Sequence, residues 1–396
     1  MNLKNLPIEG KKVLVRVDFN VPFDSEGNIS DDTRIRAALP TIQYILGKGA
    51  SVILMSHLGR PKGKIDPKLS LAPCAKRLSE LLDQKVQMAP DCIGEKVEKM
   101  AAALKNGEAL LLENLRFYIA EEKPDTDPSF AENLAKLADF YVNDAFGTAH
   151  RAHSSTAAIV GYFSEKAAPG LLLQKEIDFL GTHFSNPKHP FYAIIGGAKV
   201  SSKLGVLQSL LEKVDGLFIG GGMAYTFFKA AGLEIGDSLC EDELLPKAKE
   251  FLEIAKKKKV PIFLPKDLVI ANVFSNDAEK RIILSEAGIP KGWQGLDIGP
   301  ITRTEWANTL KNAQMIFWNG PLGVFEFPNF AEGTHSMANT LAASDAVTIV
   351  GGGDSAFAIN QLDLAEKFTH ISTGGGACLE YIQYGHLPGI DAILKN

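Results

Sequence analysis

The chain has 396 residues, of which 45% are hydrophobic and 22% charged, the composition of a globular protein long enough for two domains that each bury a core. Its net charge of −5 excludes nucleic-acid binding driven by overall charge. No apolar run approaches the ~20 residues of a membrane span, the first residues lack a signal core, and the four cysteines lack metal-site spacing. We expect a cytoplasmic monomer with reduced thiols and with no nucleic-acid or membrane partner.

The first half of the chain alternates strand-like and helix-like runs. Strands are predicted at residues 13–17, 51–55, 109–112 and 140–142, and a helix at about residues 31–46. Polar and basic residues follow these strands or open the helix, namely Asp18, Asn20, Arg34, His57, Arg60, Arg116 and Arg151. A parallel sheet brings the carboxyl ends of its strands to one edge, so these side chains are expected to meet there.

Five of these side chains, the four arginines and His57, are potential cations. Like charges repel, so their convergence is favourable only around an anionic ligand, and the planar fork of arginine suits phosphate and carboxylate. The alternative is that these are surface arginines with ordinary salt bridges. Farther on, Ala168-Pro169-Gly170 breaks the pattern, and Leu171–Leu180 is predicted to form a helix that connects two domains.

The second half repeats one construction, a β-branched or aromatic run followed by glycines and a helix start. Its clearest example is Thr348–Phe357, where Gly351, Gly352 and Gly353 precede Asp354 and Ser355. Glycines let the backbone approach a ligand, and the N–H groups of a helix start attract anions. Asp354 would repel a bare phosphate but would hold a magnesium ion that accompanies one. The alternative is that Asp354 and Ser355 only cap the helix.

Two lysines and one acid add to this pattern. Lys199 and Lys203 are four residues apart and are predicted to lie on one face of a helix start, where cations are unfavourable unless an anion is present. They are therefore predicted phosphate ligands. Glu326 follows the turn after Trp318 and could accept a ribose hydroxyl, although plain surface exposure explains it equally well.

The chain resembles phosphoglycerate kinase over essentially its whole length. The matching motifs are residues 16–22, 56–61, 113–117, 147–153, 196–200, 318–321, 352–355 and 374–376. The resemblance implies an α/β protein with two doubly wound parallel-sheet domains joined by a waist helix and able to bend at a hinge. The implied domains are residues 1–169, which would bind 3-phosphoglycerate, a connecting helix at 170–186, and a nucleotide-binding domain at 187–379. Residues from about 380 to 396 would return to the first domain.

The resemblance also implies a reaction, reversible Mg²⁺-dependent phosphoryl transfer between 1,3-bisphosphoglycerate and ADP in glycolysis. The implied ligands of the triose are Asp18, Phe19, Asn20, Arg34, His57, Leu58, Gly59, Arg60, Arg116 and Arg151. Those of ATP or ADP are Lys203, Gly220, Gly221, Glu326, Gly352, Gly353, Asp354 and Ser355, with Asp354 on the metal. The groups around the transferred phosphoryl would be Arg34, Lys199, Gly374, Gly375 and Gly376.

Two other functions would explain part of this pattern. An NAD-dependent oxidoreductase would explain the glycine turns, but the strand that follows the Gly351–Gly353 turn lacks the acid that binds a ribose. A non-catalytic anion-binding protein would be expected to lack Lys199, Arg34 or Asp354, and all three are present. Cys378 departs from the family, which often has serine there, and its place near a helix start predicts a thiol that is alkylated faster than Cys74 and is protected by MgATP.

Overall fold

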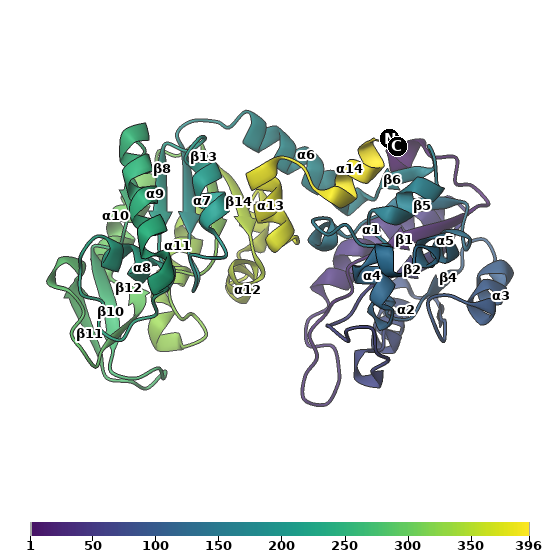
Figure 1. Cartoon of the computed structure of the whole chain (residues 1–396), viewed down its shortest axis with the longest axis horizontal. Coiled ribbons are helices and arrows are strands. Elements are labelled where there is room, and N and C mark those ends of the chain that lie inside the picture. Colours follow the sequence, from purple (N-terminus) through teal and green to yellow (C-terminus); the bar gives the residue numbers. More distant parts are fainter. Residues whose placement is uncertain (1, 396) are drawn as a thin grey trace. The chain divides into compact units, whose positions relative to one another are not determined.

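The computed structural model describes residues 2–395, which form two compact units. The first unit comprises residues 1–178 and 384–396, and the second comprises residues 179–383. The last residues of the chain therefore belong to the first unit. There the Gly389 N–H donates to the Ala149 carbonyl at 2.8 Å, and helix α14 (Pro388–Leu394) lies beside strand β6 (Ala167–Pro169) (Figure 1).

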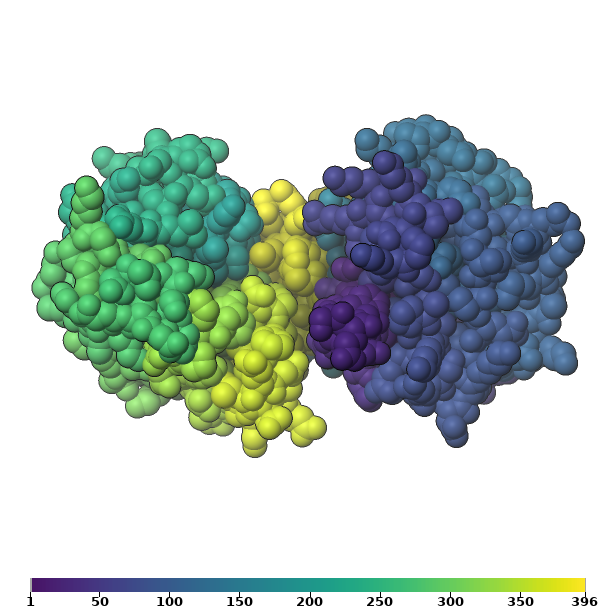
Figure 2. Space-filling view, turned by 90° about the horizontal axis from the view of Figure 1, so that it is seen from below, coloured from purple at the N-terminus to yellow at the C-terminus, as the bar shows by residue number. Residues whose placement is uncertain are grey.

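The first unit contains a parallel sheet with the order β3-β4-β2-β1-β5-β6. Its strands are β1 (Lys12–Arg16), β2 (Ser51–Met55), β3 (Val86–Met88), β4 (Ala109–Leu111), β5 (Phe140–Asn143) and β6. Its helices are α1 (Thr33–Gly47), α2 (Ala72–Leu82), α3 (Glu95–Ala103), α4 (Ile119–Glu122), α5 (Ser129–Ala135) and α14. The loop of residues 22–30, before α1, protrudes from this unit (Figure 2, dark purple).

The strand sequences explain why helices cover both faces of this sheet. Val13 and Val15 of β1 point into one apolar cluster, and Leu14 between them is also fully buried. Successive strand side chains point to opposite faces, so both faces are covered, as a parallel sheet requires. Ala167–Pro169 forms edge strand β6 instead of the predicted break, since a proline is compatible with an edge position.

The second unit contains two sheets. The parallel sheet has the order β15-β14-β13-β7-β8-β9, and an antiparallel sheet has the order β11-β10-β12. The parallel strands are β7 (Phe191–Ile195), β8 (Gly216–Ile219), β9 (Ile262–Phe263), β13 (Met315–Asn319), β14 (Val347–Gly351) and β15 (His370–Ile371). The antiparallel strands are β10 (Asp267–Ala271), β11 (Lys280–Leu284) and β12 (Gln294–Ile298). The helices are α7 (Leu204–Leu210), α8 (Met223–Ala230), α9 (Leu245–Lys258), α10 (Pro300–Leu310), α11 (Glu332–Ala342), α12 (Gly353–Gln361) and α13 (Gly376–Tyr384).

Helix α6 (Leu171–Ser185) contains the boundary between the units. Its start is fixed by the first unit, because the buried Asp144 carboxylate accepts hydrogen bonds from the N–H groups of Leu172 (2.9 Å) and Leu173 (3.2 Å). These are two of the donors that a helix start leaves without partners. Burial raises the pKa of Asp144 to about 6. The predicted α/β class with two doubly wound parallel sheets is confirmed, and the sequence-based prediction missed the antiparallel sheet.

In the part of the chain that the structure describes, none of the helices has the length and apolar character needed to cross a bilayer.

Candidate functional site

The predicted anion site of the first unit is built around Asp18, directly after β1. Nη1 of Arg34, in the first turn of α1, lies 3.1 and 3.0 Å from the two carboxylate oxygens of Asp18. Burial raises the pKa of Asp18, but the guanidinium groups of Arg34 and Arg16 and the N–H of Asn20 favour the carboxylate, and the pKa of this carboxyl is lowered. The contact uses only Nη1 of Arg34, whose side chain is 40% exposed, and the other donors of this guanidinium make no hydrogen bond to the described residues.

Gly59 joins two more of the predicted residues. Its N–H donates to Asn20 Oδ1 at 2.8 Å, and its carbonyl accepts from Nη1 of Arg116 at 2.8 Å. Gly59 has φ +61°, and a Cβ there would meet Leu69 at 2.7 Å, so a larger residue would displace this turn. The Asn114 side chain accepts a hydrogen bond from the Leu58 N–H through Oδ1 and donates one to the Leu58 carbonyl through Nδ2. The strand-end loops are thus fixed before any ligand arrives.

The remaining predicted residues of this site have different surroundings. The side chains of Phe19 and Leu58 are buried, so only their backbone can reach a ligand. Arg151 is exposed and donates from Nε to His150 Nε2 at 2.9 Å. Arg60 is exposed, and among residues 2–395 no hydrogen bond or ion pair of its side chain is present. An exposed arginine held by no protein group is free to bind an anion.

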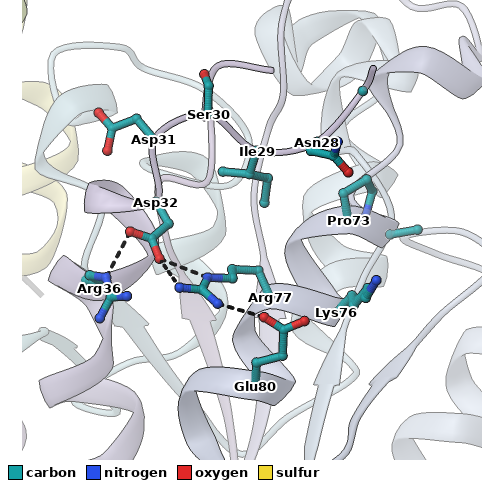
Figure 3. A pocket seen from close by; sticks show the side chains of 12 residues that line it. Asn28, Ile29, Ser30, Asp31, Asp32, Arg36, Pro73, Lys76, Arg77 and Glu80 are labelled. Atoms are coloured by element: carbon teal, nitrogen blue, oxygen red, sulfur yellow. Dashed lines mark hydrogen bonds and ion pairs between the residues drawn. The ribbon is translucent and has the colours of Figure 1, made fainter. Parts of the chain in front are cut away.

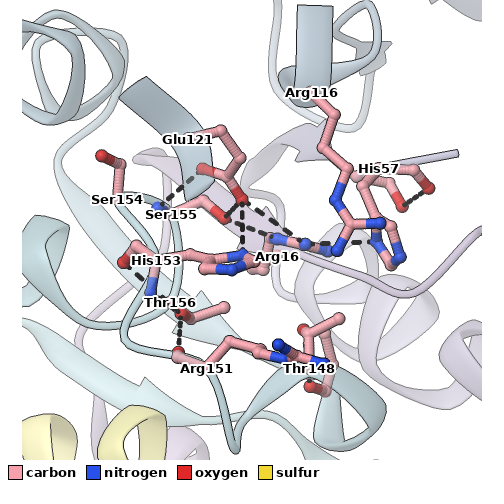
Figure 4. A network of polar contacts seen from close by, with 12 residues as sticks. Arg16, His57, Arg116, Glu121, Thr148, Arg151, His153, Ser154, Ser155 and Thr156 are labelled. Atoms are coloured by element: carbon pink, nitrogen blue, oxygen red, sulfur yellow. Dashed lines mark hydrogen bonds and ion pairs between the residues drawn. The ribbon is translucent and has the colours of Figure 1, made fainter. Parts of the chain in front are cut away.

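The sequence-based prediction missed a buried polar cluster beneath this site, which we call the Arg16 cluster: Arg16, Glu121 and Ser155 (Figure 4). Arg16 and Glu121 are 0% exposed and lie 3.7 Å apart. The Ser155 hydroxyl accepts from Arg16 Nε at 2.7 Å and donates to Glu121 at 2.6 Å. The position of Arg16 at the end of the apolar run of β1 could have indicated this cluster, because a buried charged residue needs a buried partner.

The second unit contains a cavity of about 330 Å³ that unites three of the predicted nucleotide ligands, Gly221, Glu326 and Asp354. Its walls also include Gly197, Ala198 and Pro321 of the matching motifs, together with residues outside those motifs, namely Gly222, Tyr225, Leu239, Phe274, Gln294, Gly295, Leu296, Gly323 and Val324. Apolar walls with a few acidic and amide groups are typical of ligand sites.

The glycines of this region keep the loops around the cavity close together. A Cβ on Gly221 would lie 2.7 Å from both the Gly197 N and the Pro321 carbonyl, so only glycine fits where these three turns meet. The neighbouring Gly220 donates its N–H to the Ile195 carbonyl and packs against Leu322. Gly220 therefore supports the cavity wall from behind.

Helix α12 decides between the two interpretations of Asp354. Its N-cap is Gly352, at φ +96°, and no side chain caps it. Asp354 is exposed and, in the described part of the chain, makes no hydrogen bond, whereas Ser355 is buried and accepts from the Gly320 N–H at 2.7 Å. The interpretation of Asp354 as a helix cap is therefore wrong, and the Ser355 hydroxyl is already used within the protein. A free carboxylate at a helix start, on a cavity wall, fits a cation that arrives with a ligand.

The two lysines differ from their predicted placement. Helix α7 starts at Leu204 with Lys203 as its N-cap, so Lys199 lies in the preceding turn and the two do not share a helical face. Lys203 Nζ donates to the side chain of Asn319 and to its carbonyl (3.2 Å). Burial lowers the pKa of Lys203 to about 8, although Asp354 acts in the opposite direction. The prediction placed the helix one turn too early because the glycine turn continues through residue 203.

The last predicted glycine turn leads into α13. Gly375 has φ +52°, Gly374 donates its N–H to the Ser372 hydroxyl at 3.2 Å, and the helix begins at Gly376. Nothing within 4 Å would meet a Cβ on Gly375 or Gly376, so the backbone at this helix start is open to a ligand. Such a start favours an anion.

A larger hollow, about 770 Å³, lies beside α1 and α2 but contains none of the predicted residues (Figure 3). Four of its six charged side chains are paired with one another. Asp32 bonds Arg36 (2.8 Å) and Arg77 (2.8 Å), and Arg77 also contacts Glu80 at 2.7 Å. Opposite charges that are paired largely cancel, so they attract an ionic ligand only weakly. The size of this hollow alone therefore does not make it a candidate site.

The predicted reactivity of Cys378 is wrong on exposure. Cys378, on α13, is 0% exposed. Cys74 and Cys92 are also 0% exposed, whereas Cys240 is partly exposed. Burial raises the pKa of Cys74 to about 12. We expect iodoacetamide to label Cys240 first and Cys378 only when the protein unfolds, because alkylation needs an accessible thiolate. Peptide mapping after brief labelling, with and without urea, measures this, and rapid labelling of Cys378 in the native protein would contradict it.

Comparisons with known proteins agree on one family. The family model described as Phosphoglycerate kinase matches residues 3–384. The chain is 55% identical to the cytosolic phosphoglycerate kinase of Triticum aestivum, covering 98% of this chain and 96% of the relative. It is 54% identical to the phosphoglycerate kinase of Moorella thermoacetica, covering 100% and 99%. The solved phosphoglycerate kinase of Coxiella burnetii superposes with a TM-score of 0.88 at 41% identity, covering 100% of this chain and 99% of that one.

Proposed function

This chain belongs to the phosphoglycerate kinase family, and on that premise we propose that its first domain, residues 1–169, binds 3-phosphoglycerate and that residues 187–379 bind the nucleotide. The chain is a phosphotransferase of glycolysis. In the proposed reaction a phosphoryl group passes reversibly between 1,3-bisphosphoglycerate and ADP, which gives 3-phosphoglycerate and ATP.

The observation that carries the triose site is the convergence of arginines on the strand-end loops around Asp18. The nucleophile in the ATP-consuming direction is the carboxylate of 3-phosphoglycerate, which is already ionised at pH 7 and needs no base. The reaction needs positioning and charge neutralisation instead. Arg34 and Arg60 offer donors that no protein group satisfies, and Arg116 and Asn20 are anchored on Gly59.

The nucleotide site is proposed at the cavity between α8, β12 and the start of α12. Glu326 lies on its wall and suits a ribose hydroxyl, while Lys203 and Asp354 lie where phosphates and their cation are expected. Arg34, Lys199 and the α13 start at Gly374–Gly376 are proposed to stabilise the phosphoryl group during transfer. Arg34 and the other two groups belong to different units. Transfer requires the two ligands to meet, so we propose that binding of both rearranges the units at the hinge.

Mg²⁺ is the proposed cofactor. Asp354 is a single free carboxylate, and residues 2–395 contain no cluster of three acidic, histidine or cysteine side chains that could enclose a metal. One carboxylate fits a Mg²⁺ that is held mainly by nucleotide phosphates and water. When bound, the ion would neutralise charge on those phosphates. Asp354 would orient it, and the nearby Lys203 would contact the phosphates.

The experiment that tests this function is ATP consumption with 3-phosphoglycerate, coupled to removal of the acyl phosphate product, with and without Mg²⁺. Turnover of roughly tens per second that disappears with a chelator is the expected result. ATP binding without turnover would overturn the assignment of the triose. Reduction of NAD by a hydroxy acid would instead favour the oxidoreductase alternative.

The affinity for ATP is expected to depend on pH because Lys203 is partly buried. Its pKa is lowered to about 8, so the side chain loses its positive charge as the pH rises through that value. We expect the dissociation constant for ATP to increase several-fold between about pH 7 and pH 9, as one charge–phosphate contact is lost. Arginine stays charged over this range, so Lys203→Arg should bind ATP almost equally at both pH values.

Lys213 provides the matched control, because it is also half-buried but donates to the Phe184 carbonyl outside the cavity. Lys213→Arg should keep the wild-type pH dependence in isothermal titration calorimetry. A wild-type affinity that does not change between the two pH values would contradict the role given to Lys203.

We also propose a cytoplasmic location, which the names of relatives from Triticum aestivum and Arabidopsis thaliana support, since both are called cytosolic. A monomer is also proposed. Sedimentation equilibrium would test it.

A further inference from the structure

The Arg16 cluster lies directly beneath the proposed triose site, and contacts within the cluster fix the orientation of the Arg16 side chain. Arg16 is the last residue of β1, so its side chain starts inside the sheet and cannot reach solvent. Its Nε donates to the Ser155 hydroxyl at 2.7 Å, and its Nη2 lies 3.7 Å from Glu121 Oε1. Glu121 is also held by the Ser155 N–H at 3.1 Å. The guanidinium is therefore fixed in one orientation.

The same Nη2 atom lies 3.3 Å from Nδ1 of His57 (Figure 4). An arginine guanidinium has donors and no acceptor, so Nδ1 must present its lone pair to Arg16. A neutral imidazole that accepts at Nδ1 carries its proton at Nε2. We infer that Arg16 is a positioning residue that holds His57 as a neutral side chain with its proton on Nε2.

The surroundings of His57 agree with this inference. The charged groups that face it are Asp18, whose Oδ1 lies 3.9 Å from Nδ1, and the guanidinium groups of Arg16, Arg34 and Arg116. Asp18 favours the protonated imidazole, but 3.9 Å exceeds hydrogen-bonding distance and three cations oppose it. Burial, more than any of these charges, lowers the pKa of His57 well below its usual value. The His57 side chain is 5% exposed, and the described residues give Nε2 no hydrogen-bond partner.

This inference corrects the expectation that His57 is one of five cations at this site. It rests on the proposed function in one respect, namely that Nε2–H is directed to an oxygen of 3-phosphoglycerate. A neutral donor contributes direction without charge, so the attraction for the anion comes from the arginines alone. Binding of the triose should then show no contribution from histidine titration between about pH 6 and pH 8.

The primary test is nitrogen-15 NMR of histidine-labelled wild-type protein, with the His57 signals assigned by their absence in His57→Gln. Long-range proton–nitrogen correlations distinguish an unprotonated ring nitrogen from a protonated one. The expected result is an unprotonated Nδ1 and a protonated Nε2 throughout pH 6–8. A proton on Nδ1, or a ring protonated on both nitrogens at pH 7, would overturn the inference. The tautomer is measured in the wild-type protein, and only the assignment of the signals depends on His57→Gln.

The role of Arg16 is tested by Arg16→Met/Glu121→Gln, which removes both buried charges together because a single unpaired charge would destabilise the core. We expect a mixture of the two neutral His57 tautomers and a KM for 3-phosphoglycerate raised about tenfold, with the KM for ATP unchanged. Tyr141→Phe is the matched control, since it removes a buried hydrogen bond to the Ser155 carbonyl (2.8 Å) without touching His57. It should leave the tautomer and both KM values unchanged. An unchanged tautomer in the double variant would overturn the role of Arg16.

Failure of this inference and failure of the proposed function give different results. If 3-phosphoglycerate leaves the His57 signals unshifted while the tautomer is as expected, the ligand site is wrong and the Arg16–His57 relation stands. If the ligand shifts the signals of a His57 that carries its proton on Nδ1, the site stands and the inference is wrong.

Discussion

Replacing Arg34 by alanine is expected to lower kcat by about a hundredfold or more, the size of effect seen when a preorganised transition-state donor is lost. Nucleotide affinity should remain nearly unchanged. Arg34 is held at one atom only, Nη1 against Asp18 at 3.0 Å, and its side chain is 40% exposed. It is thus oriented by the protein while most of its donors remain for the phosphoryl group. The loss should exceed that of an ordinary surface ion pair, which is worth ~1 kcal/mol at most.

The measurement combines steady-state kinetics with calorimetric titration of ATP and of 3-phosphoglycerate. Arg36→Ala is the matched control: Arg36 lies on the same helix and is paired with Asp32 at 2.8 Å, beside the hollow that contains no predicted site residue. It should retain near wild-type kcat. A variant Arg34→Ala with normal kcat would refute the catalytic role. A large fall in ATP affinity would instead move Arg34 to the nucleotide site.

The strand ends could be predicted because their signal is local. An apolar run that stops at Asp18, or at His57, indicates both a strand and the edge where its polar residue lies. The register of a parallel sheet then brings several such ends together, as β1 pairs with β2 and with β5. The contacts of Asp18 with Arg34 and of Asn20 with Gly59 follow from that edge.

What could not be predicted depends on partners distant in sequence. Arg16 and Ser155 are 139 residues apart, and no pattern along the chain indicates that they meet. The role of Asp144 at the start of α6 is equally non-local. The antiparallel strands β10–β12 were missed because their pairing depends on tertiary context more than on propensity. Lys199 and Lys203 are apparent from the sequence, but helix α7 starts at Leu204 and not before them, since the exact end of a helix is the least certain part of a pattern.

Replacing Asp354 by asparagine has the second large expected effect, and it distinguishes the metal from the phosphate. The substitution keeps the shape of the side chain and removes a charge that, in the described chain, makes no hydrogen bond. If this carboxylate holds a magnesium ion, kcat/KM for MgATP should fall by about a hundredfold, which corresponds to a few kcal/mol of lost metal interaction. Binding of ATP without magnesium should be unchanged or tighter, because a carboxylate repels bare phosphate.

The pKa of Lys203 provides a second measurement that tests the Asp354→Asn prediction. Asp354 raises the pKa of Lys203 against the lowering by burial, so Asp354→Asn should move that pKa farther below 8 and shift the loss of ATP affinity to lower pH. Asp345→Asn is the matched control, an exposed acid of the same unit that makes no side-chain hydrogen bond or ion pair within residues 2–395 and lies outside the cavity. It removes the same charge and should change neither quantity. Equal losses with and without magnesium would contradict the metal role, since a carboxylate that only shapes the cavity would affect both forms of the nucleotide alike.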